Sequence, residues 1–170
     1  MTFPFAIEIL ASDHERALFK SGVEPLDRYL ASQASRDIRR RVSACFVAVE
    51  TGTKSVAGYY TIAATSIPLL EIAAGTARKL PRYPLVPAVR IGRLAVAEAH
   101  RGKGLGSALL VDGMMRALRA EIMAYAVVVD AKDEKAAAFY RHHGFIAFNS
   151  VPMSLYLPLA EVARKLASHP

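Results

Sequence analysis

The sequence predicts one mixed α/β domain, in which a sheet of mixed strand direction carries helices on its faces. Two adjacent apolar segments in the first half are joined by a short polar turn at residues 51–54, which is typical of a β-hairpin. The second half alternates strand-like and helix-like segments, and Ala124–Asp130 (AYAVVVD) is too apolar to have a solvent-exposed face. Because no repeat, composition shift or low-complexity linker interrupts the 170 residues, we expect a single domain over residues 1–170.

The first half is expected to supply three strands and one helix. Pro25 suits the first turn of a helix. Apolar residues then recur at helical spacing at Leu26, Tyr29, Leu30 and Ala34. A break is expected near Ser35, before the basic stretch Arg36–Arg41. The expected strands are Ala6–Leu10, Ala44–Glu50 and Val56–Ile67.

The second half begins with a proline-rich segment, Pro68–Pro87, which we expect to be irregular apart from a short helix around Glu71–Lys79. The strands that follow are predicted at Ala88–Ala97, at Ala124–Asp130 and, as one or two strands, within Phe145–Leu157. The helices are predicted at Ser107–Ala120 and Asp133–His142, and Gly144 is expected to end the second of them.

Bulk properties restrict the partners of this chain. The formal net charge is +7 and the pI is about 9.8, which favours an anionic partner such as a phosphorylated cofactor, a nucleic acid or an acidic protein. No apolar run reaches the about 18 residues of a membrane span, and Met1–Pro4 lacks the pattern of a secretion signal. With Cys45 as its one cysteine, the chain is expected to be a cytoplasmic protein with no membrane partner.

A glycine-rich loop follows the strand predicted at Ala88–Ala97 and opens the next helix, which makes it a candidate anion site. The first amides of a helix have no intrahelical partner, and the helix dipole adds positive potential there. Glycines allow close approach of a phosphate, and the neighbouring Arg101 and Lys103 add charge. The dinucleotide fingerprint fails because its third glycine position is Ser107, and the P-loop pattern is absent. On the loop alone, a tight turn without a ligand remains the alternative.

The same loop resembles a known signature. Arg101-x-x-Gly104-x-Gly106 is similar to the [QR]-x-x-G-x-[GA] motif of the GNAT superfamily of N-acetyltransferases. Two flanking segments agree in order and spacing, namely Arg93-Leu94-Ala95-Val96 and Ala138-Phe139-Tyr140-Arg141-x-x-Gly144-Phe145. The resemblance implies the GNAT fold, a twisted and mostly antiparallel mixed sheet that splays between its fourth and fifth strands and is flanked by helices.

The resemblance also implies which residues bind acetyl-CoA. The backbone of Leu94, Ala95 and Val96 would pair with the pantetheine arm. The pyrophosphate would lie on the loop, at Arg101, Gly102, Lys103, Gly104, Leu105, Gly106 and Ser107. The helix that carries Ala137 and Phe139 would lie along the coenzyme. No metal is expected, because the adjacent His142 and His143 point apart on a helix and no ligand set surrounds them.

The chemistry is the attack of an amine on an acetyl thioester. A backbone N–H near Val96 could polarise the carbonyl. Tyr140 matches the GNAT position that protonates the leaving thiolate, and an ordinary tyrosine pKa near 10 keeps the hydroxyl protonated at neutral pH. The alternative is that Tyr140 is only a core aromatic. Glu98 is the nearest candidate base, and the lack of a clear base favours an amine of low pKa, such as an α-amino group.

A narrower resemblance covers about Phe5 to Leu157. The segments that carry it are Phe19-x-Ser21-Gly22-x-x-x-Leu26-Asp27-x-Tyr29-Leu30, Phe46-Val47-Ala48, Gly58-Tyr59-Tyr60, Gly92–Val96, Val129-Asp130-Ala131 and Ala138-Phe139-Tyr140. They are similar to the TacT/AtaT-type toxins of bacterial toxin–antitoxin modules. That resemblance implies acetylation of the free amine of aminoacyl-tRNA, inhibition of translation, a homodimer, and neutralisation by a ribbon–helix–helix antitoxin.

A tRNA-binding surface would be basic, and arginine forks suit phosphates. The candidate tRNA contacts are Arg36, Arg39, Arg40, Lys79, Arg90 and Arg93. Arg90 and Arg93 point to opposite faces of a regular strand, so both line one groove only if a bulge intervenes.

The alternatives are a solvated or antitoxin-binding basic face, and an ordinary GNAT enzyme that acetylates a small amine or a protein N-terminus. A third possibility is a module that binds acetyl-CoA without catalysis.

Overall fold

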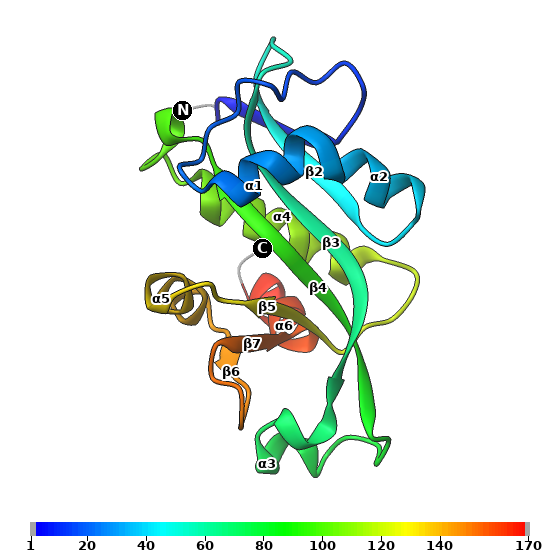
Figure 1. Ribbon diagram of the computed structural model, residues 1–170. Coiled ribbons are helices and arrows are strands. Elements are labelled where there is room, and N and C mark those ends of the chain that lie inside the picture. Colours follow the sequence, from blue (N-terminus) through cyan, green and yellow to red (C-terminus); the bar gives the residue numbers. More distant parts are fainter. Residues whose placement is uncertain (1–2, 169–170) are drawn as a thin grey trace. The chain divides into compact units, whose positions relative to one another are not determined.

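In a computed structural model, which describes residues 3–168, seven strands form a mixed sheet in the order β1-β2-β3-β4-β5-β7-β6. The strands are β1 (Phe5–Ile9), β2 (Ala44–Glu50), β3 (Val56–Pro68), β4 (Leu85–Val96), β5 (Ala126–Asp130), β6 (Ile146–Ala147) and β7 (Ser154–Pro158). The helices are α1 (Glu24–Arg28), α2 (Ala34–Arg39), α3 (Ala74–Ala77), α4 (Leu105–Arg119), α5 (Glu134–His142) and α6 (Leu159–Ala167) (Figure 1).

The strand directions confirm the predicted mixed α/β class. β1, β2 and β3 form an antiparallel meander, and β7 is antiparallel to both β5 and β6. β4 and β5 are parallel, with Ala88 opposite Ala126 and Ile91 opposite Val129. A parallel pair needs a crossover connection, and α4 provides it.

The described chain forms two compact units. The first contains residues 3–63 and 92–113, and the second contains residues 64–91 and 114–168. β3, β4 and α4 each run from one unit into the other, so both units are assembled from two separate stretches of sequence.

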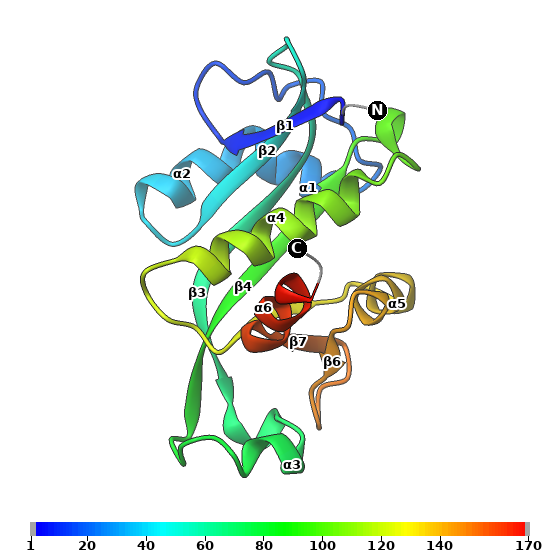
Figure 2. The ribbon, with the colours of Figure 1, turned by 180° about the vertical axis from the view of Figure 1, so that it is seen from behind.

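The core of the first unit lies between the sheet and the α1–α2 segment. It contains Tyr29, Leu30, Ala34, Cys45, Val47, Tyr59, Ala95 and Ala97 among others. The Tyr59 hydroxyl donates to the Leu26 carbonyl oxygen at 2.7 Å, which ties β3 to α1. The N-terminal half of α4 covers the other face (Figures 1 and 2). There a Cβ on Gly58 would lie 2.9 Å from Leu109 Cδ1, so this glycine permits the close approach of α4 to β3.

The helical segment after Pro25 differs from the prediction. The expected break near Ser35 is wrong, because Ser35 lies inside α2. The irregularity is a π-helical turn, Tyr29–Gln33, in which the Ala34 N–H donates to the Tyr29 carbonyl oxygen. Arg16 donates to the Leu30 carbonyl oxygen at 3.1 Å and to Ser35 Oγ at 3.0 Å, so its guanidinium spans this wide turn.

Helix α2 ends with an arginine where a glycine is usual. Arg41 has a positive φ of 59°. Its N–H donates to the Ile38 carbonyl oxygen and the Val42 N–H donates to the Asp37 carbonyl oxygen, both at 3.0 Å. This is a Schellman motif, which most often has glycine at the left-handed position.

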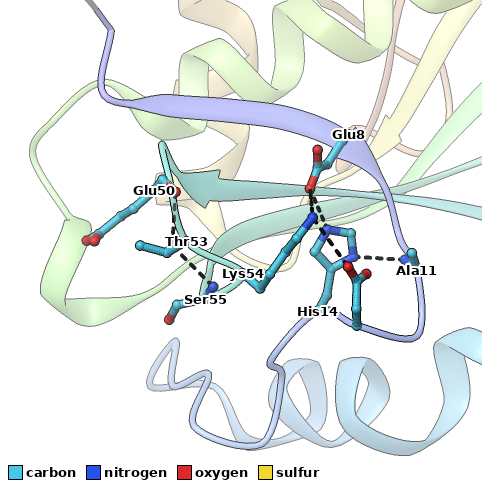
Figure 3. A network of polar contacts seen from close by, with 8 residues as sticks. Glu8, Ala11, His14, Glu50, Thr53, Lys54 and Ser55 are labelled. Carbon is cyan, nitrogen blue, oxygen red and sulfur yellow. Dashed lines mark hydrogen bonds and ion pairs between the residues drawn. The ribbon is translucent and has the colours of Figure 1, made fainter.

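The segment between β1 and α1 is fastened to β1 by a buried histidine (Figure 3). His14 Nδ1 accepts the Ala11 N–H at 2.8 Å, and its Nε2 lies 2.6 Å from Glu8 Oε1. Lys54, from the β2–β3 turn, lies 3.8 Å from the same Glu8 oxygen and 3.3 Å from Asp13 Oδ2. These contacts fix the course of the chain that leads to α1.

The second unit is built on β4, β5 and β7. Its core contains Ile67, Ile72, Val86, Ala88, Ala126, Val128 and Tyr156. Helix α6 was not predicted; its Leu159 and Val162 are buried. The segment Pro68–Pro87 is less irregular than expected, because β4 already begins at Leu85 and the Pro87 carbonyl oxygen accepts the Tyr125 N–H at 2.8 Å. The predicted helix around Glu71–Lys79 shortens to α3.

Within residues 3–168, no helix has both the length and the apolar character needed to cross a membrane.

Candidate active site

The glycine-rich loop connects β4 to α4 in the first unit. Gly102 and Gly104 have φ values of 76° and 77°, a region that side chains rarely adopt. A Cβ on either glycine would meet no heavy atom within 4 Å, so the backbone conformation, not crowding, requires glycine there. The loop is exposed from Arg101 to Gly104, and α4 begins at Leu105. The loop thus presents an accessible backbone at a helix N-terminus, which fits a phosphate.

The two charged side chains of this loop have neighbours of their own. The Arg101 guanidinium donates to the Ser21 carbonyl oxygen, which joins the loop to the segment before α1. Lys103 Nζ lies 3.3 Å from His100 Nδ1, and His100 Nε2 lies 3.1 Å from Glu50 Oε1. Lys103 is exposed and can turn toward an anion, whereas Arg101 positions a neighbouring loop.

Glu98, the candidate base, lies against Gly22. Its Oε1 is 2.6 Å from the position that a Gly22 Cβ would occupy, and its N–H donates to the Lys20 carbonyl oxygen at 2.8 Å. Gly22 has a φ of 88°. The absence of a side chain at Gly22 leaves space for the side chains of Glu98 and Arg101 beside residues 19–22.

The backbone of β4 presents two different edges in the first unit. The Arg93 N–H donates to Thr61 Oγ1 at 3.0 Å and the Ala97 N–H donates to the Ala57 carbonyl oxygen at 2.8 Å, so both face β3. Because backbone groups alternate along a strand, those of Leu94 and Val96 face the opposite edge. Of the three predicted coenzyme contacts on β4, Leu94 and Val96 therefore have the backbone orientation needed to pair with an extended ligand, and Ala95 does not.

Arg93 lies over an aromatic ring. Its Cζ is 3.6 Å from the centroid of Tyr29, and the Tyr29 hydroxyl donates to Asp37 Oδ2 at 2.8 Å. Burial, followed by the hydrogen bond to Asp37, raises the pKa of Tyr29 to about 12. The sequence placed Tyr29 on the apolar face of a helix and in a segment of the narrower resemblance, but it did not indicate the contact with Arg93 on a distant strand.

Tyr140 belongs to α5 in the second unit. Asp133 caps this helix by accepting the Ala136 N–H at 2.8 Å, and Ala137 and Tyr140 are buried on one face. The Tyr140 ring centroid lies 5.3 Å from that of Phe139 and 5.7 Å from that of Phe145. Gly144, with a φ of 93°, ends α5 as predicted, and the backbone hydrogen bonds there form a Schellman motif.

The Tyr140 hydroxyl is a weak acid in this setting. Burial first, and then the negative charge of Asp130, raise the pKa of Tyr140 to about 12. Asp130 forms an ion pair with Arg90 and accepts a hydrogen bond from Ser154 Oγ at 2.7 Å. Arg90, a predicted tRNA contact, thus already has a carboxylate partner, whereas Arg93 contacts an aromatic ring.

The remaining predicted tRNA contacts are exposed. Arg36, Arg39 and Arg40 lie three and four residues apart at the end of α2, which places them on one side of the helix. Lys79 follows α3 in the second unit, next to the exposed Arg78. None of Arg36, Arg39 and Arg40 forms an ion pair with a carboxylate in residues 3–168. Over the same residues, no group of three His, Cys, Asp or Glu side chains is placed to hold a metal ion.

Residues 42–147 match the model of the acetyltransferase (GNAT) domain. The chain belongs to the GNAT acetyltransferase family. It is therefore an N-acetyltransferase that takes its acetyl group from acetyl-CoA.

Two relatives of this GNAT chain are named as toxins. A "tRNA-acetylating toxin" of Mycobacterium tuberculosis is 35% identical over 150 residues, which are 87% of this chain and 87% of that protein. A "probable toxin TacT" of Sinorhizobium fredii is 27% identical over 158 residues, 88% of this chain and 87% of that protein.

Solved structures with the same fold cover nearly the whole chain. AtaT complexed with acetyl-methionyl-tRNAfMet has a TM-score of 0.89 and 26% identity, over 95% of this chain and 99% of that one. AtaTR bound with acetyl-CoA has a TM-score of 0.82 and 25% identity, over 96% and 98%. An AtaT–AtaR complex bound to DNA has a TM-score of 0.76 and 25% identity, over 95% and 99%.

Proposed function

We propose that this GNAT chain is a toxin that acetylates the free amino group of aminoacyl-tRNA and thereby inhibits translation. The observation that carries the proposal is its 35% identity, over most of both chains, with the tRNA-acetylating toxin. The AtaT structure with acetyl-methionyl-tRNAfMet supports the same acceptor class. A formal charge of +7 suits a polyanionic substrate.

Different residues are assigned to the binding of acetyl-CoA and to proton transfer. Acetyl-CoA supplies the acetyl group as an activated thioester. We assign the backbone of Gly102 to Ser107, with the Lys103 charge, to the pyrophosphate, and the outward backbone groups of Leu94 and Val96 to the pantetheine arm. Ala137 and Phe139 on α5 are assigned to the coenzyme because their positions match the family motif. Arg101 would act mainly by holding the Ser21 segment.

Tyr140 is assigned the role of general acid. Transfer of the acetyl group leaves a thiolate, which must be protonated, and Tyr140 is protonated over the physiological pH range because its pKa is about 12. The acceptor is an α-amino group, whose ordinary pKa near 7.7–8.0 leaves a fair fraction neutral, so a strong general base is unnecessary. This suits a chain in which Glu98, the candidate base, is placed against Gly22.

The basic side chains are assigned to the RNA. Arg93, Arg36, Arg39, Arg40 and Lys79 would contact phosphates, and Arg90 would contribute less because Asp130 neutralises it. A homodimer and a ribbon–helix–helix antitoxin are proposed as partners; the AtaT–AtaR complex supports the antitoxin. The translation machinery as target implies action in the cytoplasm.

Incubation of the purified protein with acetyl-CoA and a set of aminoacyl-tRNAs tests this function. We expect N-acetyl-aminoacyl-tRNA from at least one charged tRNA, and none from the Tyr140→Phe variant, which should still bind acetyl-CoA. If a protein that binds acetyl-CoA acetylates no charged tRNA, but does acetylate a small amine or a peptide N-terminus, the toxin proposal is wrong.

A further inference from the structure

Three side chains from separate segments of the first unit form a connected series. Asp37 on α2 accepts the Tyr29 hydroxyl at 2.8 Å, and the Tyr29 ring lies beneath the guanidinium of Arg93 on β4, with 3.6 Å between Cζ and the ring centroid. Gln33 Nε2 donates to the other Asp37 oxygen at 3.3 Å. The Tyr29 side chain is therefore held by Asp37 at its hydroxyl group and contacts Arg93 through the face of its ring.

The charge of Arg93 has no carboxylate partner in the described chain. The side chain is half-buried, and none of its contacts in residues 3–168 is an ion pair. A partly desolvated guanidinium is costly unless something compensates its charge. The Tyr29 face compensates part of it, but a ring covers only the flat face of the fork. The N–H groups point outward in the plane of the guanidinium, where they can take an anion bidentately.

The position of Arg93 along β4 relates it to the reaction. Its side chain lies on the same face as Ala95, which is in the core, and it directly precedes Leu94–Val96. Burial raises the pKa values of Tyr29, Cys45 and Tyr59, and the positive charge of Arg93 lowers them. The Arg93 guanidinium is therefore close enough to affect buried groups of this unit.

A π-helical turn carries Tyr29. Tyr29 is the first residue of the turn, which widens the helix between α1 and α2. Such turns cost regular hydrogen bonding and occur frequently at functional sites. Because the pKa of Tyr29 is raised to about 12, its hydroxyl stays protonated and continues to donate to Asp37.

We propose that Tyr29 and Asp37 are positioning residues that hold the Arg93 guanidinium as the phosphate-binding group of the acceptor site. The anion is a backbone phosphate at the 3′ end of the tRNA. In an aminoacyl-tRNA the amino acid carboxyl group is esterified, so phosphates are the anions close to the reacting amine. This inference rests on the proposed function.

The test compares two acceptors that share an ester-linked α-amine: an aminoacyl-tRNA, and the methyl ester of the same amino acid, which has no phosphate. The variants are Arg93→Lys, Tyr29→Phe and Tyr29→Leu. Arg28→Lys is the matched control, because Arg28 lies on α1 and pairs with Glu24. Acetyl-CoA binding and thermal unfolding are measured for each variant.

For aminoacyl-tRNA we expect the KM to rise about tenfold in Arg93→Lys and in Tyr29→Leu, and about threefold in Tyr29→Phe, which keeps the ring but loses the bond to Asp37. The Arg93→Lys/Tyr29→Leu double variant should lose little more than either single variant. The KM for the methyl ester and the affinity for acetyl-CoA should stay within about twofold of wild type, and Arg28→Lys should match wild type. A purely structural role of Tyr29 would impair both acceptors alike.

Equal effects on the two acceptors, or no effect on aminoacyl-tRNA, would overturn the inference. If Tyr29→Leu does not fold, Arg93→Lys and Tyr29→Phe decide the question. If the wild type acetylates no aminoacyl-tRNA, the proposed function fails, and binding of uncharged tRNA then tests this inference separately. In that case a common loss of affinity in Arg93→Lys and Tyr29→Phe supports the phosphate site, and unchanged or absent tRNA binding contradicts it.

Discussion

At the scale of single residues, Tyr140 is buried and lies near the negative charge of Asp130. Both effects penalise the phenolate, and they raise the pKa of Tyr140 to about 12. A general acid works in its protonated form, so activity that depends on Tyr140 is retained below its pKa and lost only as the pH rises through it. Even at pH 10, roughly 1% of Tyr140 would be ionised.

We therefore predict that kcat of the wild type shows no alkaline decrease due to Tyr140 below about pH 11, and that Tyr140→Phe lowers kcat by about 10²–10⁴-fold at every pH. The measurement is kcat against pH with saturating acetyl-CoA, on protein shown to remain folded. An alkaline limb between pH 8 and 9 that disappears in Tyr140→Phe would contradict the raised pKa.

Asp130 provides a second check on the same residue. Its charge is the second cause of the raised pKa of Tyr140. Asp130→Asn should therefore lower the pKa of Tyr140 and move any alkaline loss of activity to lower pH. The rate at neutral pH should change little, because Tyr140 is protonated there in both proteins. Because Asp130 also pairs with Arg90, the Arg90→Gln variant is the control, and it should not shift the alkaline limb in the same direction.

At the scale of elements, the loop between β4 and α4 depends on two left-handed glycines. Gly104→Ala should destabilise the fold by about 1–2 kcal/mol, because its φ is positive, and should raise the KM for acetyl-CoA. Gly52, in the β2–β3 turn, has a φ of 85° and equally open surroundings. Gly52→Ala should thus cost similar stability without changing that KM. Urea unfolding and acetyl-CoA kinetics on both variants separate backbone strain from coenzyme binding.

The ends of α2 and α5 show the same motif made with different residues. Gly144 occupies the left-handed position of α5, and Arg41 occupies that of α2. Arg41→Gly should stabilise the protein by about 0.5–1 kcal/mol, since relief of about 1–2 kcal/mol of strain is partly offset by the greater freedom of glycine in the unfolded chain. Arg39→Gly, at the last residue of the same helix, should instead destabilise the protein, by at most about 1 kcal/mol. If denaturant melts show both variants to be destabilised, Arg41 makes a stabilising contact that outweighs its strain.

The element scale also shows what the sequence could predict. Regular signals were sufficient for β2, β3, α4, β5 and α5, where a hydrophobic period or a glycine stop marks the bounds. The π-helical turn Tyr29–Gln33 was not predicted, because the apolar residues of this segment recur at ordinary helical spacing. Helix α6 was not predicted, although its two buried residues, Leu159 and Val162, are three residues apart, which is helical spacing.

Some residues of the candidate site could likewise be predicted from the sequence, and others could not. The glycine loop and Tyr140 carry a local motif, so they could be proposed from sequence. The edge of β4 that the Val96 backbone faces depends on strand register. The Arg90–Asp130 pair and the Arg93–Tyr29 stack depend on contacts between distant segments. No local pattern encodes them.

At the scale of the whole molecule, the net charge of +7 predicts salt-dependent RNA binding. Neutralising Arg36, Arg39 and Arg40 together should reduce the slope of log affinity for tRNA against log salt by roughly 2–3 units, if each contacts one phosphate. Neutralising Arg28, Arg119 and Arg164 removes the same formal charge elsewhere and should change the slope much less. Equal slopes for the two triple variants would mean that α2 is not part of the RNA-binding surface.

Cys45 is expected to be unreactive in the native protein, which makes site-specific labelling at another position possible. It is the one cysteine of the chain, it is 1% exposed, and burial raises the pKa of its thiol to about 12. Since the thiolate is the reactive form, alkylating reagents should leave the native protein unmodified near neutral pH. A cysteine introduced at Arg39 would then be the sole labelled site, so a fluorophore or photo-crosslinker attached there could report bound RNA. In the unlabelled protein, the rate of slow modification of Cys45 would report how often the core that contains Cys45 and Tyr29 opens.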